Sequence, residues 1–150
     1  MTLELEPLDP IGARIVDADL DDLLGSPRAP GEILAALEEN GVLVFRGLSL
    51  DDATQLALAK RLGEVIARPG SGDRGASGWS REHPGIYRIA LDSEASDDFY
   101  VKGSWDWHLD GSTGGACPPK ATMLSCRVPP GLGGETEFVS TYAAYDRLSR

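Results

Sequence analysis

Several kinds of residue are scarce in this sequence, and each shortage excludes a class of protein. Only 2 of the 150 residues are cysteines, which is too few for a disulfide scaffold. Lys and Arg number 14 against 24 Asp and Glu, and the resulting net charge of −10 opposes binding to a polyphosphate backbone. No apolar run approaches the roughly 20 residues that a membrane-spanning helix needs. We therefore expect neither a nucleic-acid-binding protein nor a membrane protein.

The first residues and the two cysteines both indicate a reducing compartment. Residues 1–10 alternate leucine with glutamate and lack the basic start and the apolar stretch of a secretory signal. We therefore expect a cytoplasmic protein, in which Cys117 and Cys126 are buried or partly buried free thiols.

The rest of the composition is typical of a single globular domain, with 41% hydrophobic and 25% charged residues. The apolar spacing and the Gly, Pro and capping residues predict a regular element in each of several segments. These are a strand at 11–16, an acidic turn at 17–22, a loop at 26–31, a helix from Pro30 to Asn40, a buried strand at 42–46, a helix that Ser49 caps and that ends before Gly63, strands at 121–128 and 136–139, and a last helix that begins near Ser140 or Thr141.

A long polar segment separates the two halves of the chain. Residues 68–84 are rich in glycine, serine and arginine and show no apolar period. Long loops in compact domains are commonly binding segments, but the composition fits plain disorder equally well.

The segment Trp107-His108-Leu109-Asp110 carries the strongest chemical signal. In a strand, residues two apart point to the same face, so the His108 imidazole and the Asp110 carboxylate would converge. A neutral nitrogen and an anionic oxygen suit a first-row divalent ion, and one further histidine would complete the facial triad of non-haem Fe(II) oxygenases. A His-x-Asp tripeptide also arises by chance, and the alternative is a packed histidine beside Trp105 and Trp107, which we expect to serve packing.

The chain resembles the taurine dioxygenase and 2,4-dichlorophenoxyacetate dioxygenase family of Fe(II)- and 2-oxoglutarate-dependent oxygenases. The likeness runs through nearly the whole chain, because several family motifs occur in the expected order. They are Gly12-Ala13-Arg14-Ile15, Asn40-Gly41-Val42-Leu43-Val44-Phe45-Arg46-Gly47, Leu62-Gly63-Glu64, Trp107-His108-Leu109-Asp110, Gly133-Gly134-Glu135-Thr136 and Thr141-Tyr142-Ala143-Ala144-Tyr145.

This resemblance implies an α+β, mainly β fold with a double-stranded β-helix (jelly-roll) core and flanking N-terminal helices. Residues 1–150 would be the N-terminal part of a single TauD-like dioxygenase domain. We expect the C-terminal part of that domain to be missing, because the last helix reaches Arg150 without a cap, a glycine or a proline.

The same resemblance implies the site. His108 and Asp110 would be catalytic residues and the first two iron ligands, and the Thr136 hydroxyl would bind a carboxylate of the co-substrate 2-oxoglutarate. For Thr136 the alternative is a strand residue whose hydroxyl bonds the backbone. The family's second histidine and its 2-oxoglutarate-binding arginine have no match here, because His83 sits in the Gly-rich loop and is expected to be a solvated loop histidine.

The implied activity is that of an oxidoreductase, a dioxygenase that consumes Fe(II)-bound 2-oxoglutarate and dioxygen. It would oxidise an unactivated C–H bond of a small, in this family often anionic, organic substrate and release succinate and CO2. The basic residues that could meet such a substrate, or that are merely solvated loop charges, are Arg68, Arg74, Arg81 and Lys102.

Two other classes of function stay open at this point. The 150-residue chain could be an inert truncated fragment, or it could be a non-catalytic jelly-roll binding module that uses the same cleft. In the fragment, an uncovered sheet edge also predicts poor solubility or self-association, for example as a homo-oligomer.

Overall fold

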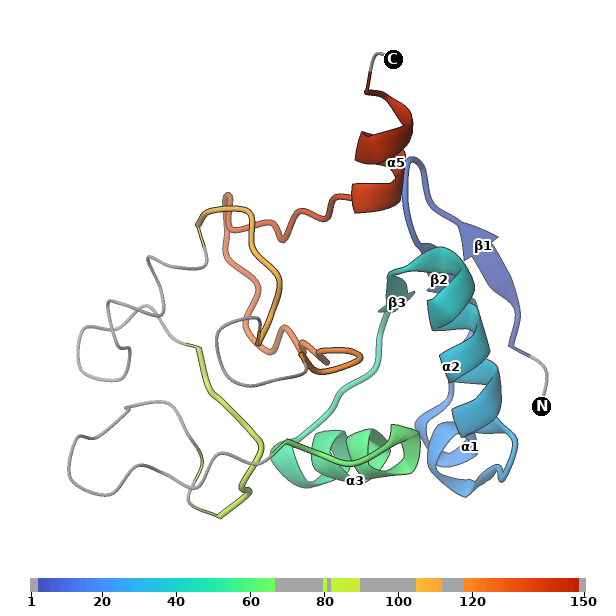
Figure 1. The fold of residues 1–150 in the computed structure, drawn as a ribbon. Helices are drawn as coiled ribbons and strands as arrows, with labels where there is room; N and C mark the ends of the chain where they lie inside the picture. The colour runs from blue at the N-terminus through green and yellow to red at the C-terminus, as the bar shows by residue number, and fades with distance from the viewer. Residues whose placement is uncertain (1–2, 67–79, 81, 90–104, 112–117, 149–150) are drawn as a thin grey trace. The chain divides into compact units, whose positions relative to one another are not determined.

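The computed structural model describes residues 3–66, 80, 82–89, 105–111 and 118–148 (Figure 1). The chain divides into two compact units, one of residues 1–50 with 126–150 and one of residues 51–125. The described residues combine helices with a small sheet, which confirms the α+β class, and they form no closed barrel. The jelly-roll core therefore stays a prediction.

A three-stranded sheet lies in the first unit. Its strands are β1 (Leu5–Pro7), β2 (Ala13–Ile15) and β3 (Leu43–Phe45), in the order β1-β2-β3. β1 runs antiparallel to β2, and β3 runs parallel to it. The central strand places Ala13 and Ile15 in the core, where both are buried.

Two of these strands confirm predictions, and the third was missed. β2 and β3 lie inside the predicted strands at 11–16 and 42–46 and are shorter than them. β1 was not predicted, although Leu3 to Glu6 alternates apolar and acidic residues with the period of two that a half-buried strand shows.

The helix α1 (Leu20–Gly25) begins at residue 20, inside the segment 17–22 that was predicted as an acidic turn, so that prediction is wrong for residues 20–22. The Asp19 carboxylate accepts a hydrogen bond from the Asp22 backbone N–H at 3.0 Å and caps the helix. Leu23 is completely buried. The acidic residues that suggested a turn instead stabilise the first turn of a helix, where a negative charge meets the positive end of the helix dipole.

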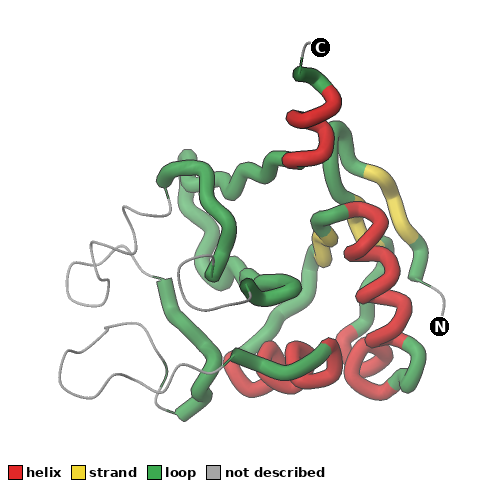
Figure 2. Tube along the Cα trace, viewed as in Figure 1, coloured by secondary structure: helices red, strands yellow, loops and turns green. Residues whose placement is uncertain are grey.

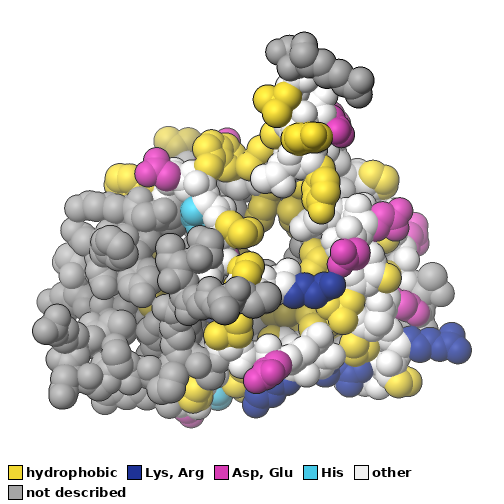
Figure 3. Space-filling view, in the orientation of Figure 1, with side chains coloured by type: hydrophobic (Ala, Val, Ile, Leu, Met, Phe, Trp, Pro, Cys, Tyr) yellow, Lys and Arg dark blue, Asp and Glu magenta, His cyan; other side chains and the backbone are white. Residues whose placement is uncertain are grey.

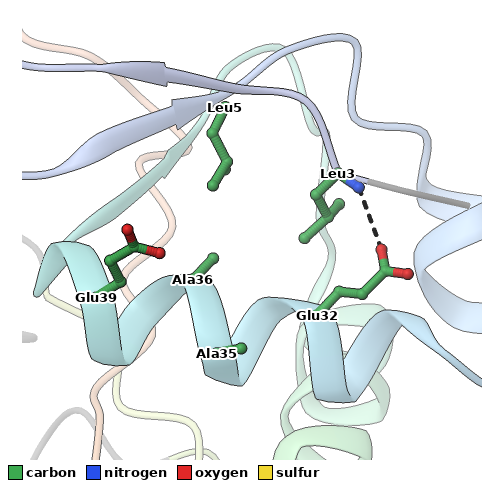
Figure 4. A pocket seen from close by; sticks show the side chains of 6 residues that line it. All are labelled: Leu3, Leu5, Glu32, Ala35, Ala36 and Glu39. Carbon is green, nitrogen blue, oxygen red and sulfur yellow. Dashed lines mark hydrogen bonds between the residues drawn. The ribbon is translucent and has the colours of Figure 1, made fainter.

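The helix α2 (Ala29–Asn40) confirms the amphipathic helix predicted from Pro30 and ends at Gly41, as expected. It lines a groove beneath β1, and Figure 4 shows the side chains of both elements facing each other. The Leu3 backbone N–H donates to the Glu32 carboxylate at 3.1 Å. This bond fixes the chain just before β1 against α2.

The helix α3 (Asp52–Leu62) opens the second unit. Its cap is Asp51, whose carboxylate accepts from the Thr54 N–H at 2.7 Å while the Thr54 hydroxyl accepts from the Asp51 N–H at 2.9 Å. The prediction that Ser49 is the cap is therefore wrong. Asp51 with Thr54 makes a reciprocal capping box, which satisfies two backbone donors instead of one.

Two later segments of the second unit are anchored on α3. Arg88 donates from Nε and Nη2 to the buried Asp52 carboxylate at 3.2 and 2.7 Å, and this bonding raises the pKa of Arg88. The Gln55 amide donates to the Met123 carbonyl at 3.1 Å. The helix thereby holds the chain on both sides of residues 105–111.

The helix α5 (Thr141–Asp146) confirms the last predicted helix, and Ser140 caps it. The strands predicted at 121–128 and 136–139 are wrong, because the structure forms no strand there, and Figure 2 shows only loop in the described trace between α3 and α5. A strand needs a neighbour that completes its hydrogen-bond ladder, and no described segment pairs with either stretch.

Candidate metal centre

His108 and Asp110 converge, although not in the way that the sequence indicated. Residues 107–109 have no regular secondary structure, and Asp110 and Gly111 form a turn, so the predicted strand is wrong. The His108 Nε2 atom nevertheless lies 3.1 Å from Asp110 Oδ1. Gly111 has a φ of +71°, a conformation that glycine adopts without strain, and the turn there brings the carboxylate back toward the imidazole.

The orientation of the His108 ring follows from a bond on its other side. Its Nδ1 lies 2.7 Å from the Asp106 carbonyl oxygen. A carbonyl can only accept, so Nδ1 carries a proton and, in the neutral ring, Nε2 presents its lone pair. The bond with Asp106, together with the Asp110 carboxylate, raises the pKa of His108, against a smaller opposing effect of burial.

The geometry at Nε2 needs either a proton or a metal ion between the two side chains. The neutral Nε2 and the Asp110 carboxylate are both acceptors, and two acceptors 3.1 Å apart repel each other unless a proton or a metal ion lies between them. Ligand bonds of about 2.1 Å that meet at a right angle separate two donor atoms by about 3.0 Å. The separation in this pair therefore fits two adjacent ligands of one octahedral ion.

The third ligand of such a site is not among the described residues. No group of three His, Cys, Asp or Glu side chains there could hold a metal ion. His83, the chain's other histidine, is half-buried. Its backbone N–H donates to the Ser80 hydroxyl at 3.0 Å and its carbonyl accepts from the Ile86 N–H at 3.0 Å. This agrees with a loop residue that takes no part in the site.

Thr136 belongs to the first unit and His108 to the second. Gly133 and Gly134 both have positive φ, +72° and +77°, a conformation that glycine adopts readily in turns. The Thr136 side chain is exposed, and within the described part of the chain its hydroxyl makes no hydrogen bond. The alternative role of Thr136, bonding the backbone in a strand, is therefore not what the structure shows.

Two expectations about other residues are corrected, and a third group of residues is not described. Trp105 and Trp107 are 75% and 66% exposed, so they do not pack in a core in the described structure. Cys126 is a free thiol, as expected, but it is exposed. Arg68, Arg74, Arg81, Lys102 and Cys117 lie outside the described residues.

One feature of this centre had no signal in the sequence. The Asp106 group that orients His108 is a backbone carbonyl, which every residue possesses, so only the folded path of the chain reveals it. The role of Gly111 was open to prediction, since a glycine directly after a ligand often marks a turn with positive φ.

Comparisons with known proteins place the chain in a family. The model of the taurine catabolism dioxygenase TauD, TfdA family matches residues 4–150. The chain is 34% identical, over its whole length, to an alpha-ketoglutarate-dependent 2,4-dichlorophenoxyacetate dioxygenase of Cupriavidus pinatubonensis, and covers 54% of that relative. It is also 34% identical to an alpha-ketoglutarate-dependent sulfate ester dioxygenase of Pseudomonas putida, over 92% of this chain and 41% of the relative.

A solved structure agrees with these matches. A protein of Burkholderia xenovorans, titled as a candidate alpha-ketoglutarate-dependent taurine dioxygenase, aligns with 61% of this chain and 31% of its own at 32% identity and a TM-score of 0.50. None of the helices among the described residues has the length and apolar character of a membrane span.

The chain spans about half the length of the curated relatives it matches. Over that span it belongs to the taurine catabolism dioxygenase TauD, TfdA family.

Proposed function

We propose that this chain is the metal-binding part of an Fe(II)- and 2-oxoglutarate-dependent dioxygenase that acts on a small organic molecule. The observation that carries the proposal is the pairing of the His108 Nε2 atom with the Asp110 carboxylate at 3.1 Å. The names of the relatives support it, since two of them are alpha-ketoglutarate-dependent dioxygenases. The complete domain would have the jelly-roll core of the family.

Several residues of this chain have separate roles in the proposed site. His108 and Asp110 hold the ion through one neutral nitrogen and one carboxylate oxygen, and the Asp106 carbonyl keeps the imidazole in the tautomer that can ligate. The exposed Thr136 hydroxyl donates to a carboxylate of 2-oxoglutarate. Bound Fe(II), with 2-oxoglutarate and dioxygen, supplies the oxidation that converts the co-substrate to succinate and CO2.

The 150-residue chain is not expected to catalyse the reaction by itself. Its histidines number only 2, and His83 does not join His108 in a group of ligands among the described residues. Two ligands bind an ion less tightly than three, and they do not fix the positions of the ion's remaining ligands. We therefore propose that activity needs a third ligand from outside this chain.

Succinate release tests the proposal. The chain alone, and the chain joined to the part of the Cupriavidus pinatubonensis relative that it does not cover, are supplied with Fe(II), 2-oxoglutarate and oxygen. We expect no succinate from the chain alone, succinate from the joined protein, and none from its Asp110→Ala variant. A folded joined protein that binds Fe(II) and releases no succinate would favour the non-catalytic binding module.

A further inference from the structure

The turn that carries Asp110 leaves no room for a side chain at Gly111, because Pro119 lies beside it. A Cβ built on Gly111 would lie 2.5 Å from Cδ and 3.0 Å from Cγ of Pro119. The distance of 2.5 Å is too short for a Cβ atom and a carbon of a neighbouring residue, so one of the two residues would have to move. The proline ring is closed on its own backbone and cannot rotate away, so the displacement would pass into the main chain.

Gly111 is bonded directly to Asp110, the residue that supplies one of the proposed metal ligands. Gly111 follows Asp110 in the chain, and only the Cβ atom separates the Asp110 carboxylate from its own Cα. A shift of the Gly111 backbone therefore moves the Asp110 backbone and, with it, the carboxylate. Ligand sets need their donor atoms within about 0.5 Å of the productive positions, so a small displacement of the turn is enough to spoil the pair.

The backbone conformation makes a second demand at the same position. The φ of Gly111, +71°, lies in the left-handed region, which residues with a side chain seldom adopt. Gly47 shares this conformation, with a φ of +77°, but no atom of the described residues lies within 4 Å of a Cβ built on it. Gly47→Ala therefore serves as a control for placing alanine at a glycine of positive φ outside the metal centre.

We propose that Gly111 is a positioning residue for the metal centre. Because it carries no side chain, the turn at Asp110 lies against Pro119 without displacement of the carboxylate from the His108 imidazole. The inference rests on the proposed function, because it concerns the same metal pair, and it adds a residue of this chain that acts on the ion only through Asp110.

Manganese titration followed by NMR tests this role on the 150-residue chain. The chain has 2 histidines, so the His83 ring signals serve as an internal reference for those of His108. Mn²⁺ alone is added, and the concentration that half-broadens the His108 ring signals is measured. The proteins compared are the natural chain, Gly111→Ala, Gly47→Ala, Pro119→Ala and the double variant Gly111→Ala with Pro119→Ala.

The expected pattern is specific to the contact. Gly111→Ala should raise the half-broadening concentration about 10- to 100-fold, the usual effect of losing a group that orients a metal ligand. Gly47→Ala and Pro119→Ala should leave it close to that of the natural chain. The double variant should recover most of the loss, because replacing Pro119 removes both ring carbons that the new methyl group would meet.

Three results would contradict the inference or the proposed function on which it rests, and each result shows which of the two is wrong. If the natural chain shows no selective broadening of His108, the proposed function fails and this inference fails with it. If the natural chain binds and Gly111→Ala binds equally well, only the positioning role is wrong. If the double variant recovers nothing, backbone strain rather than the contact with Pro119 governs the turn, which equally overturns the inference.

Discussion

His108 and Asp110 come together by a turn rather than along a strand. The sequence predicted the pair from a spacing of two residues, and the structure brings its two side-chain atoms to 3.1 Å while forming no strand at residues 107–109. The prediction of the pair succeeded because a two-residue spacing permits convergence in more than one backbone conformation. The hydrogen bond between His108 and the Asp106 carbonyl, by contrast, could not be predicted, because it involves a backbone group and depends on the fold of the chain.

The pH dependence of metal binding follows from the protonation of His108. The bond with Asp106 and the Asp110 carboxylate raise the pKa of His108, so a proton competes with the ion up to a higher pH than at an ordinary histidine. Metal affinity should rise with pH through that pKa, and below it should fall about tenfold per pH unit, because one proton leaves for each ion bound. Titrations of Mn²⁺ at a series of pH values measure this dependence.

The His108→Ala variant is the control for that experiment. It should bind weakly and show no rise in affinity over the same pH range. An affinity of the natural chain that does not change through the pKa of His108, measured from its ring signals, would show that the imidazole is not a ligand.

Thr136 provides a second prediction for a single residue. In the joined protein described above, Thr136→Val should raise the Kd for 2-oxoglutarate by about tenfold or more, because a hydrogen bond to a charged group contributes about 1.5–3 kcal/mol. Thr136→Ser keeps the hydroxyl and should retain most of the affinity. Equal binding of 2-oxoglutarate by the valine variant and the natural residue, measured by calorimetry, would remove Thr136 from the site.

Helices were predicted better than strands, and the reason lies in how each element is stabilised. α2, α3 and α5 form where the sequence indicated, because their caps and apolar faces are local features. The segments 121–128 and 136–139 have suitable residues for strands, but a strand depends on a partner that is distant in sequence. Local signals also failed for α1, where acidic residues suit a turn and a first helical turn alike.

The cap of α3 leads to a prediction about the stability of the chain. Asp51→Ala should lower the free energy of unfolding by about 1 kcal/mol, because it removes the oxygen that accepts from the Thr54 N–H. Ser49→Ala should leave stability nearly unchanged, since Ser49 lies outside the helix and its cap. Urea unfolding followed by circular dichroism compares the two, and a larger loss from Ser49→Ala would contradict the assignment of the cap.

The molecule as a whole exposes much apolar surface near its C-terminal end. Side chains that are more than half exposed recur from residue 124 to residue 148, and Figure 3 shows hydrophobic side chains along α5. These are Leu124, Val128, Leu132, Phe138, Val139, Tyr142, Tyr145 and Leu148. The chain covers only 54% of the relative from Cupriavidus pinatubonensis. That is also why sequence reasoning from these 150 residues could identify the family and not the arrangement of its core.

This exposed surface predicts self-association of the chain. Leu132 is 97% exposed and Tyr142 is 86% exposed, and apolar patches of this kind favour association. The molar mass from light scattering should therefore rise with concentration, and the double variant Leu132→Gln with Tyr142→Gln should reduce the rise. Glu137→Gln, which changes an exposed polar residue in the same stretch, is the control. A mass that stays monomeric at all concentrations would contradict this prediction.

An anomalous diffraction experiment on crystals grown with Mn²⁺ tests the metal centre most directly. A peak bonded to both the His108 Nε2 atom and an Asp110 carboxylate oxygen, at about 2.1 Å from each, is the predicted result. Manganese bound only elsewhere, with the imidazole and the carboxylate still joined by a proton, would contradict the assignment of these two residues as ligands.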